Sequence, residues 1–247
     1  MQNETAWRPS KFVRHGDSWR GSRDPAALSR ASRVTADLQA AAYADALATH
    51  ASGHLLDLGC GTVPAYGMFR DRVDRITCVD WADSPHPGVH VDHVADLREP
   101  LPLPDEQYDT VLLTDVLEHM PYPDALFAEL RRVLRPRGRL VVGVPFLYGL
   151  HEEPHDHHRY TEHRLRLFCE DHDLEVLELY PYGGHVAVAL DLASKMLGAF
   201  PPTRLVAGVP ALFASPALGR RRTPLPLGYV LVARRPSADV SEVSSDR

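Results

Sequence analysis

Cysteine and lysine are scarce in this chain, and long apolar runs are missing. The three cysteines, Cys60, Cys78 and Cys169, match no zinc-ligand spacing, and their odd number suggests no disulfide framework. No apolar stretch reaches the length of a membrane span, and the polar N-terminus carries no apolar signal segment. These absences predict a reduced, cytoplasmic protein without a transmembrane segment.

Positive charge is also limited. The net charge is −6 and the isoelectric point is near 6.1, which argues against a general nucleic-acid binder. A length of 247 residues with 44% hydrophobic content is ordinary for one globular domain with additions. We therefore expect a single main domain that acts on something other than nucleic acid.

The most informative stretch is a strand, a glycine turn and a helix start in direct succession. Leu55, Leu56 and Leu58 form a short apolar run that is typical of a strand buried on both faces. It leads straight into Gly59-Cys60-Gly61, and Pro64 then favours the first turn of a helix. This geometry lets a ligand approach bare backbone.

A dinucleotide-binding fingerprint is the obvious alternative, but the sequence departs from it. Its third glycine is replaced by Pro64, and Asp57 at the strand end would repel phosphates. A carboxylate here suits a cationic or amine-bearing ligand better. An ordinary tight turn without a ligand remains a further alternative.

Apolar runs with strand character alternate with apolar stripes of helical spacing along most of the chain. This alternation predicts a parallel sheet with helices on both faces. The expected strands are 54–58, 76–80, 89–94, 108–114, 140–144, 174–180 and 228–233, and the expected helices lie within 25–50, 63–71, 123–134, 162–171 and 186–197.

Asp80 ends the second of these strands, about twenty residues after the glycine turn. In nucleotide-binding α/β folds an acid at this place accepts hydrogen bonds from both hydroxyls of a ribose. A carboxylate has two oxygens and so fits a vicinal diol well. We expect Asp80 to bind a ribose, with a solvated strand-end aspartate as the alternative.

Four ordered motifs resemble those of a known family. Asp57-x-Gly59-x-Gly61 resembles motif I of the class I S-adenosylmethionine-dependent methyltransferases, and Asp96-Leu97, Asp115 to His119 and Arg132 to Gly138 resemble its later motifs. The resemblance is to bacterial methyltransferases of type 11 and covers about residues 50–182. It implies a Rossmann-like fold with a seven-stranded, mostly parallel sheet whose late strands six and seven form a hairpin. The implied cofactor is S-adenosyl-L-methionine, with S-adenosyl-L-homocysteine as product.

The resemblance also assigns roles to single residues. It implies that Asp96 accepts the adenine amino group, that the Leu97 region meets a ring nitrogen, and that the segment from Asp115 faces the cofactor. His119 is expected to position that segment. The predicted cofactor-binding residues are Asp57, Gly59, Cys60, Gly61, Asp80, Trp81, Asp96, Leu97, Asp115, Val116 and His119.

One connection departs from the family pattern. Between Asp80 and Val89 only the short loop from Trp81 to Gly88 is available, whereas a parallel crossover normally needs a dozen or more residues. The crossover helix is therefore expected to be short or missing. Trp81 or the N-terminal segment would then supply the wall beside the adenine.

A histidine-rich loop at 146–160 follows the fifth strand and is predicted to lie over the reacting methyl group. His155 or His158 would serve as general base, with the tautomer set by Asp156 or a glutamate. The alternatives are a purely structural loop and a metal site for Mg, Zn or Fe. Adjacent residues of an extended loop point apart, so we predict no metal site.

The domain boundaries follow from composition. Residues 1–25 are a polar segment, either a mobile tail or a flap over the cofactor, and 26–236 form the methyltransferase domain. An insertion at 184–225 is expected to act as a lid or simply to cover the core, and 237–247 is a disordered tail. The expected flap anchors are Trp7, Phe12, Arg14 and Trp19, the expected acceptor-pocket residues are Phe200, Leu205, Leu212 and Phe213, and Arg220, Arg221 and Arg222 form a basic cluster.

These features predict methyl transfer from S-adenosylmethionine to a small molecule or to a glycan or lipid-linked sugar. Oxygen is the preferred acceptor atom, because histidines crowd the expected acceptor site. Two alternatives remain: a non-catalytic scaffold or partner subunit, and a metal-assisted or aminopropyl-transferring enzyme on the same fold. The sequence specifies neither the acceptor nor the oligomeric state.

Overall fold

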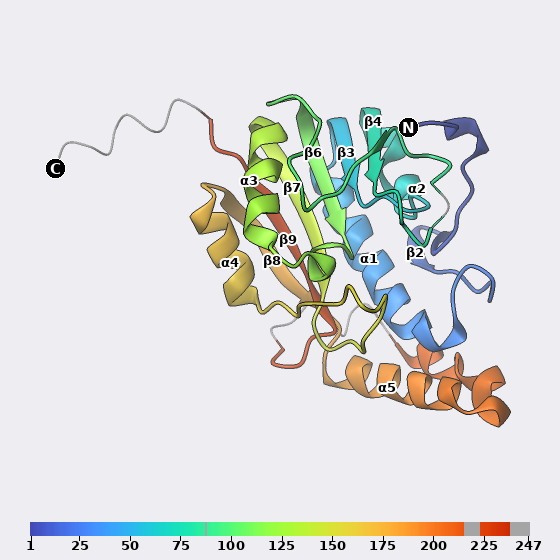
Figure 1. Cartoon of the computed structure of the whole chain (residues 1–247). Coiled ribbons are helices and arrows are strands. Elements are labelled where there is room, and N and C mark those ends of the chain that lie inside the picture. Colours follow the sequence, from blue (N-terminus) through green and yellow to red (C-terminus); the bar gives the residue numbers. More distant parts are fainter. Residues whose placement is uncertain (87, 215–222, 238–247) are drawn as a thin grey trace.

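The computed structural model describes residues 1–86, 88–214 and 223–237, and its centre is a seven-stranded sheet (Figure 1). The strand order is β5-β4-β3-β6-β7-β9-β8. In this sheet β9 runs antiparallel to β7 and β8, and the other neighbouring strands pair parallel, which confirms the expected fold class and the late hairpin. The strands are β3 (Gly53–Leu58), β4 (Val73–Asp80), β5 (His93–Val94), β6 (Tyr108–Thr114), β7 (Leu134–Pro145), β8 (Glu175–Tyr182) and β9 (Gly228–Arg234).

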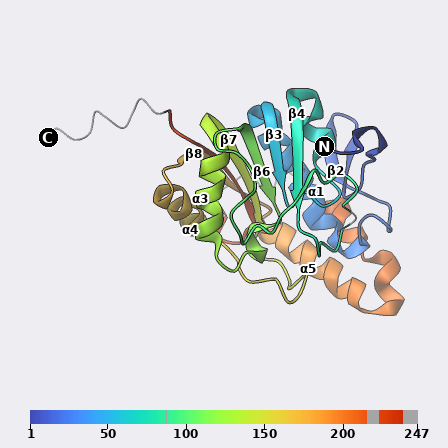
Figure 2. The same cartoon turned by 45° about the horizontal axis from the view of Figure 1, so that its top comes forward.

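Helices cover both faces of this sheet (Figures 1 and 2). Strand side chains alternate between two cores: Leu55 packs into the core under α1, whereas Leu56 and Leu58 pack into the core under α3 and α4. The helices are α1 (Arg33–His50), α2 (Tyr66–Phe69), α3 (Pro123–Val133), α4 (Glu162–Asp171) and α5 (His185–Ala199). Shorter 3-10 turns are η1 (Glu4–Ala6), η2 (Arg30–Ser32), η3 (Arg70–Arg72), η4 (Leu117–His119), η5 (Pro201–Val206) and η6 (Val209–Phe213).

Three elements differ in length from their sequence predictions. The strand expected at 89–94 is only His93–Val94, because it pairs with β4 solely through Val79 and Asp80. The helix expected at 63–71 is the four-residue α2 followed by η3. In contrast, β7 begins at Leu134, which already pairs with Tyr108 before a register irregularity.

The N-terminal segment is folded against the domain. Its hairpin consists of β1 (Phe12–His15) and β2 (Ser18–Gly21), and the side chains of Trp7 and Phe12 are buried. Trp7 Nε1 donates a hydrogen bond to the carbonyl oxygen of Val63 at 3.0 Å. The segment therefore reaches the turn that follows β3.

The insertion packs beside α1 and below it in Figure 1. Thr35 Oγ1 on α1 donates to Asp191 Oδ1 on α5 at 2.7 Å, which fixes this contact. The side chains expected to form an acceptor pocket are instead exposed: Phe200, Leu205, Leu212 and Phe213. The basic cluster 220–222 and the tail 238–247 lie outside the described residues. No helix in the described part of the chain has the length and apolar character needed to cross a membrane.

Close packing of α1 on β7 generates a stability prediction. A Cβ atom at Gly143 would lie 2.4 Å from the hydroxyl oxygen of Tyr43, whose side chain is fully buried. We expect Gly143→Ala to lower the free energy of unfolding by about 1–3 kcal/mol, because the core must expand there. Urea denaturation measures this, with Gly149→Ala as control since its Cβ would meet nothing within 4 Å. An unchanged midpoint for Gly143→Ala would contradict the packing.

Candidate functional site

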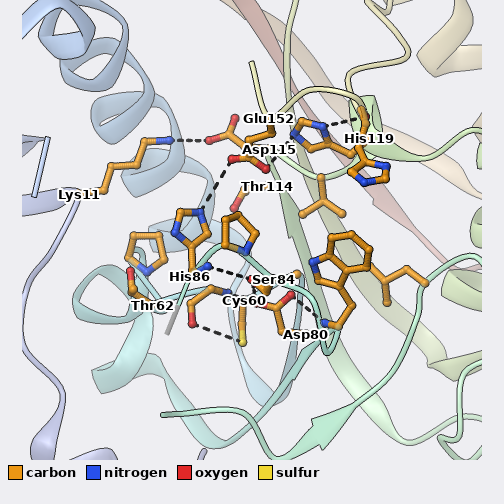
Figure 3. A pocket seen from close by; sticks show the side chains of 18 of the residues that line it. Lys11, Cys60, Thr62, Asp80, Ser84, His86, Thr114, Asp115, His119 and Glu152 are labelled. Atoms are coloured by element: carbon orange, nitrogen blue, oxygen red, sulfur yellow. Dashed lines mark hydrogen bonds and ion pairs between the residues drawn. The ribbon is translucent and has the colours of Figure 1, made fainter. Parts of the chain in front are cut away.

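The carboxyl ends of β3, β4 and β6 open onto a cavity of about 1070 Å³ (Figure 3). The strand order reverses between β3 and β6, which is where open α/β sheets bind ligands. Ser10 and Lys11 of the N-terminal segment line the cavity from the other side. All eleven residues predicted to bind cofactor line it: Asp57, Gly59, Cys60, Gly61, Asp80, Trp81, Asp96, Leu97, Asp115, Val116 and His119.

The glycine turn forms one side of this cavity and requires glycine at two positions. Gly59 and Gly61 have φ angles of 69° and 52°, in the left-handed region. A Cβ atom on Gly59 would lie 2.4 Å from Cγ2 of Val116. The amide of Gly59 donates to the Val79 carbonyl oxygen at 2.8 Å, so the turn is fixed to the end of β4. Hydrogen bonding to Cys78 and burial raise the pKa of the Cys60 thiol, so Cys60 acts as a small buried residue.

Two buried carboxyl groups lie at the base of the cavity. Burial, followed by the nearby Asp80 carboxylate, raises the pKa of Asp57 to about 8. Asp80 is held rigidly: its Oδ2 accepts hydrogen bonds from the Gly61 amide at 2.9 Å and from Ser84 Oγ at 3.1 Å, and its Oδ1 accepts from the Trp81 amide at 2.9 Å. Asp57 therefore remains largely protonated at neutral pH, while Asp80 is an oriented acceptor.

The wall expected near an adenine is built from the short loop after β4. The Trp81 ring meets the His155 ring edge-on, with centroids 5.4 Å apart. Asp96 lines the cavity but is already paired, because Arg98 binds its Oδ2 at 2.6 Å and its Oδ1 at 2.9 Å. Hydrogen bonding by Arg98 lowers the pKa of Asp96, so this carboxylate is less free than Asp80 to accept a ligand.

Asp115 joins three distant segments at the opposite side of the cavity. Its Oδ2 accepts from Lys11 Nζ at 2.7 Å, and its Oδ1 accepts from Gln39 Nε2 and Tyr43 Oη, both at 2.9 Å. Burial disfavours the charged lysine, but Asp115 outweighs it and the pKa of Lys11 is raised. The sequence carries no local signal for these contacts, since Lys11 is 104 positions away from its partner.

The histidine-rich loop lies against η4, because the amides of His157 and His158 both donate to the carbonyl oxygen of Glu118, at 2.9 and 3.1 Å. His155 lines the main cavity. The ring of His158 lies outside it, beside Tyr160 and lining a separate surface hollow. The loop therefore brings only His155 of the two predicted bases to the cavity.

Asp156 does not orient either predicted base. Arg159 Nη2 donates to its Oδ2 at 2.7 Å, and the amide of His151 donates to the same oxygen at 3.0 Å. Hydrogen bonding by Arg159 lowers the pKa of Asp156. The expectation that Asp156 sets a histidine tautomer for His155 or His158 is corrected accordingly: it fixes the loop.

Comparisons with known proteins agree with this geometry. Residues 56–142 match the family model described as a methyltransferase domain. The ubiquinone biosynthesis O-methyltransferase of Saccharophagus degradans is 31% identical over 106 residues, which cover 39% of this chain and 45% of that protein. The chain spans less than half the length of the curated relatives it matches.

Solved structures extend the likeness to the whole fold. A methyltransferase from Mesorhizobium loti that depends on S-adenosylmethionine has a TM-score of 0.53 and 14% identity, over 82% of this chain and all of that one. The cyclase SpnF has a TM-score of 0.54 and 22% identity, over 81% of this chain and 82% of that one.

The matched domain contains β4, β6, the second half of β3 and most of β7, and with them the glycine turn, Asp80 and Asp115. The cofactor of this family is S-adenosylmethionine. Residues 56–142 therefore form a methyltransferase domain, and the chain has the fold of methyltransferases that depend on S-adenosylmethionine.

Proposed function

We propose that this protein transfers the methyl group of S-adenosylmethionine to an oxygen atom of a small molecule or of a glycan or lipid-linked sugar. The observation that carries the proposal is the composition of one cavity. Asp57, the glycine turn and Asp80 line it together with His119 and His155. Residues suited to the cofactor and residues suited to accept a proton thus line one cavity.

The residues at the base fit the cofactor. The bare backbone at Gly59 and Gly61 allows close approach, and the buried Asp57 carboxyl would be ionised by an ammonium group beside it. Ribose hydroxyls would bind Asp80 in place of the Ser84 hydroxyl. When bound, the cofactor supplies a methyl group that is already activated. The protein then mainly aligns the acceptor.

Oxygen is the acceptor atom that the histidines of the cavity favour. A hydroxyl acceptor must lose a proton, and an imidazole is suited to take it near neutral pH. His155 lines the cavity and its ring is positioned by Trp81. The Saccharophagus relative is an O-methyltransferase and two Paraburkholderia relatives are C-methyltransferases, so the proposal of oxygen rests on the histidines of the cavity. No described residue of the 184–225 insertion lines the cavity, so acceptor selection is assigned to the histidine-rich loop.

The direct test is incubation with S-adenosylmethionine carrying a deuterated methyl group and with a panel of hydroxylated acceptors. Mass spectrometry should find one labelled methyl group on an oxygen, together with S-adenosylhomocysteine. A label on carbon or nitrogen would overturn the acceptor assignment. Transfer of a larger group would support the aminopropyl alternative, and tight cofactor binding without turnover would support the scaffold alternative.

Asp57 makes cofactor binding depend on pH. Its pKa of about 8 means that binding an ammonium group near pH 7 must release a proton, so affinity should rise as the pH increases toward 8. Calorimetric titration with S-adenosylhomocysteine in buffers of different ionisation enthalpy measures the release. Asp57→Asn should abolish it. Proton release that persists in Asp57→Asn would show that another group titrates.

The Asp57 carboxyl should also make the stability of the ligand-free protein depend on pH. The pKa of Asp57 is near 3.8 in the unfolded chain and about 8 in the folded protein. Between pH 3.8 and about pH 8 the folded protein therefore keeps a proton on Asp57 that the unfolded chain has lost. The contribution of Asp57 to stability therefore falls as the pH rises from 3.8 to about 8. Asp57→Asn should flatten this dependence in thermal unfolding.

Asp80 is expected to dominate ribose binding. Asp80→Ala removes both acceptor oxygens and should weaken cofactor binding by about 2 kcal/mol, or roughly 30-fold. Asp74→Ala, an exposed change on the same strand, is the matched control. If Asp80→Ala binds S-adenosylhomocysteine as well as Asp74→Ala does, the ribose is held elsewhere.

The two predicted bases are now distinguishable. His155→Ala should keep cofactor affinity and lower turnover by roughly 10²–10⁴ if the imidazole takes the proton. His158→Ala should leave turnover near the wild-type value, because its ring lies outside the cavity. Thermal unfolding of both variants controls for loop damage. Equal turnover in His155→Ala and wild type would remove His155 as the base.

A further inference from the structure

Three side chains with metal-ligating atoms converge at the wall of the cavity. Glu118 and His119 lie on η4, and His151 lies on the loop after β7; one ligand atom from each lies within 4.8 Å of the others. His119 Nε2 is 3.9 Å and His151 Nε2 is 3.7 Å from Glu118 Oε1. Figure 3 shows His119 at the edge of the cavity, with Glu152 next to it.

Glu118 provides the strongest evidence for a bound cation. Its side chain is fully buried, and neither carboxylate oxygen has a hydrogen-bond partner among the described residues. Buried carboxylates are normally paired or bound to a cation, because an isolated charge is costly to remove from water. The histidine nitrogens that face it are too distant for hydrogen bonds. The carboxylate therefore lacks a partner that the protein itself supplies.

Both imidazoles are oriented as metal ligands usually are. His119 Nδ1 is 3.1 Å from the carbonyl oxygen of His155, and His151 Nδ1 is 3.3 Å from both the Gly149 carbonyl oxygen and Asp156 Oδ2. These acceptors keep the proton on Nδ1, so each Nε2 presents a lone pair. His119 Nε2 is itself buried without a hydrogen-bond partner.

We infer that Glu118, His119 and His151 bind a divalent first-row transition-metal ion. Ligand bonds of about 2.0–2.2 Å allow two ligand atoms of one ion to be up to about 4.2 Å apart, which accommodates both measured separations. Glu152 Oε2 lies 3.7 Å from His119 Nε2 and lines the cavity beside these three residues. Two imidazole nitrogens favour Zn²⁺, Mn²⁺ or Fe²⁺ over Mg²⁺.

A proton network is the competing explanation. If His119 or His151 were charged, either could pair with Glu118 without any metal. The separations of 3.9 and 3.7 Å and the acceptors at Nδ1 favour the metal instead, since an imidazolium hydrogen bond to a carboxylate is shorter. This alternative predicts no bound metal, so elemental analysis distinguishes the two.

The role of the ion rests on the proposed function. A cation at a wall of the cavity lowers the pKa of an acceptor hydroxyl beside it. The acceptor O–H then gives its proton to His155, and the oxygen lone pair forms the new C–O bond. The C–S bond of the sulfonium breaks with its electron pair remaining on sulfur, which yields the thioether S-adenosylhomocysteine. This assignment makes hydroxyl-bearing acceptors the substrate class.

The test begins with the full chain, freed of any affinity tag and treated with EDTA. Samples are incubated with ZnCl₂, MnCl₂ or MgCl₂, passed through gel filtration and analysed for metal. We expect a single Zn²⁺ or Mn²⁺ ion per chain and no retained Mg²⁺. Glu118→Gln and His151→Ala should lose the ion. His163→Ala, an exposed histidine on α4, should retain it. The inference is overturned if the wild type retains no ion, or if Glu118→Gln and His151→Ala retain as much as the wild type.

Thermal unfolding gives an independent readout. Zn²⁺ or Mn²⁺ should raise the unfolding temperature of the wild type and of His163→Ala, but not of Glu118→Gln. Glu118→Gln should also be at least as stable as the metal-free wild type, because it removes a buried unpaired charge. Should Glu118→Gln fail to fold, His151→Ala decides, since His151 is a partly exposed loop residue.

Methyl transfer separates failure of this inference from failure of the proposed function. Transfer to a hydroxyl by protein that retains no metal, at an unchanged rate, removes the metal site and leaves the proposed function intact. A metal ion bound through Glu118 and His151 without any hydroxyl methylation keeps the site and removes the proposed function. Turnover that depends on the metal, and is lost in both variants, supports both.

Discussion

The bonds to Asp115 hold the functional site together. Its carboxylate binds Lys11 from the N-terminal segment and Gln39 and Tyr43 from α1, while its backbone, at a φ of 55°, turns the chain out of β6 into η4. One side chain thus fixes the cover of the cavity, the helix behind the sheet and the segment that carries Glu118. Because the Asp115 carboxylate binds these segments and its backbone directs the chain into η4, the shape of the cavity depends on this residue.

The acidic side chains of the site differ in how far their negative charge is compensated. Asp115 is neutralised by Lys11, and Asp80 accepts two amides and a hydroxyl. Asp57 and Glu118 have no comparable support: burial raises the pKa of both. These are the two places where we propose positively charged ligands, the ammonium group of the cofactor and a metal ion. The free protein folds although these two buried acids lack partners. In the proposed complexes, both acids would bind positively charged ligands.

Local patterns in the sequence were sufficient for most of the fold. Strand β6 at Tyr108–Thr114 and helix α4 at Glu162–Asp171 have the predicted bounds, because apolar periodicity is a short-range signal. The turn from Gly59 to Gly61 was also predicted from local sequence. The length of β5 could not be predicted in this way, because its pairing with β4 depends on how the connection before it folds.

The candidate site was predictable where a sequence motif marks its residues, as at Asp57, Asp80 and Asp115, but contacts between segments without a motif were not. Lys11 and Asp115 are 104 positions apart in the sequence, and no motif spacing predicts their contact. The proposed metal site also depends on contacts between separate segments. A metal site was discounted because neighbours in one extended loop diverge, yet the candidate ligands come from two segments. His151 meets Glu118 and His119 because the loop is hydrogen-bonded to the backbone of η4.

The fold alone does not decide the reaction, since the cyclase SpnF resembles this chain as closely as a methyltransferase does. Specific chemistry must therefore come from the side chains that line the cavity. Here a single loop carries both His155 and His151, and it is held to η4 by two amides that donate to the Glu118 carbonyl oxygen. Any shift of this loop would move the proposed base and a proposed metal ligand together. In the proposed reaction, proton removal and activation of the acceptor would thus be coupled through this loop.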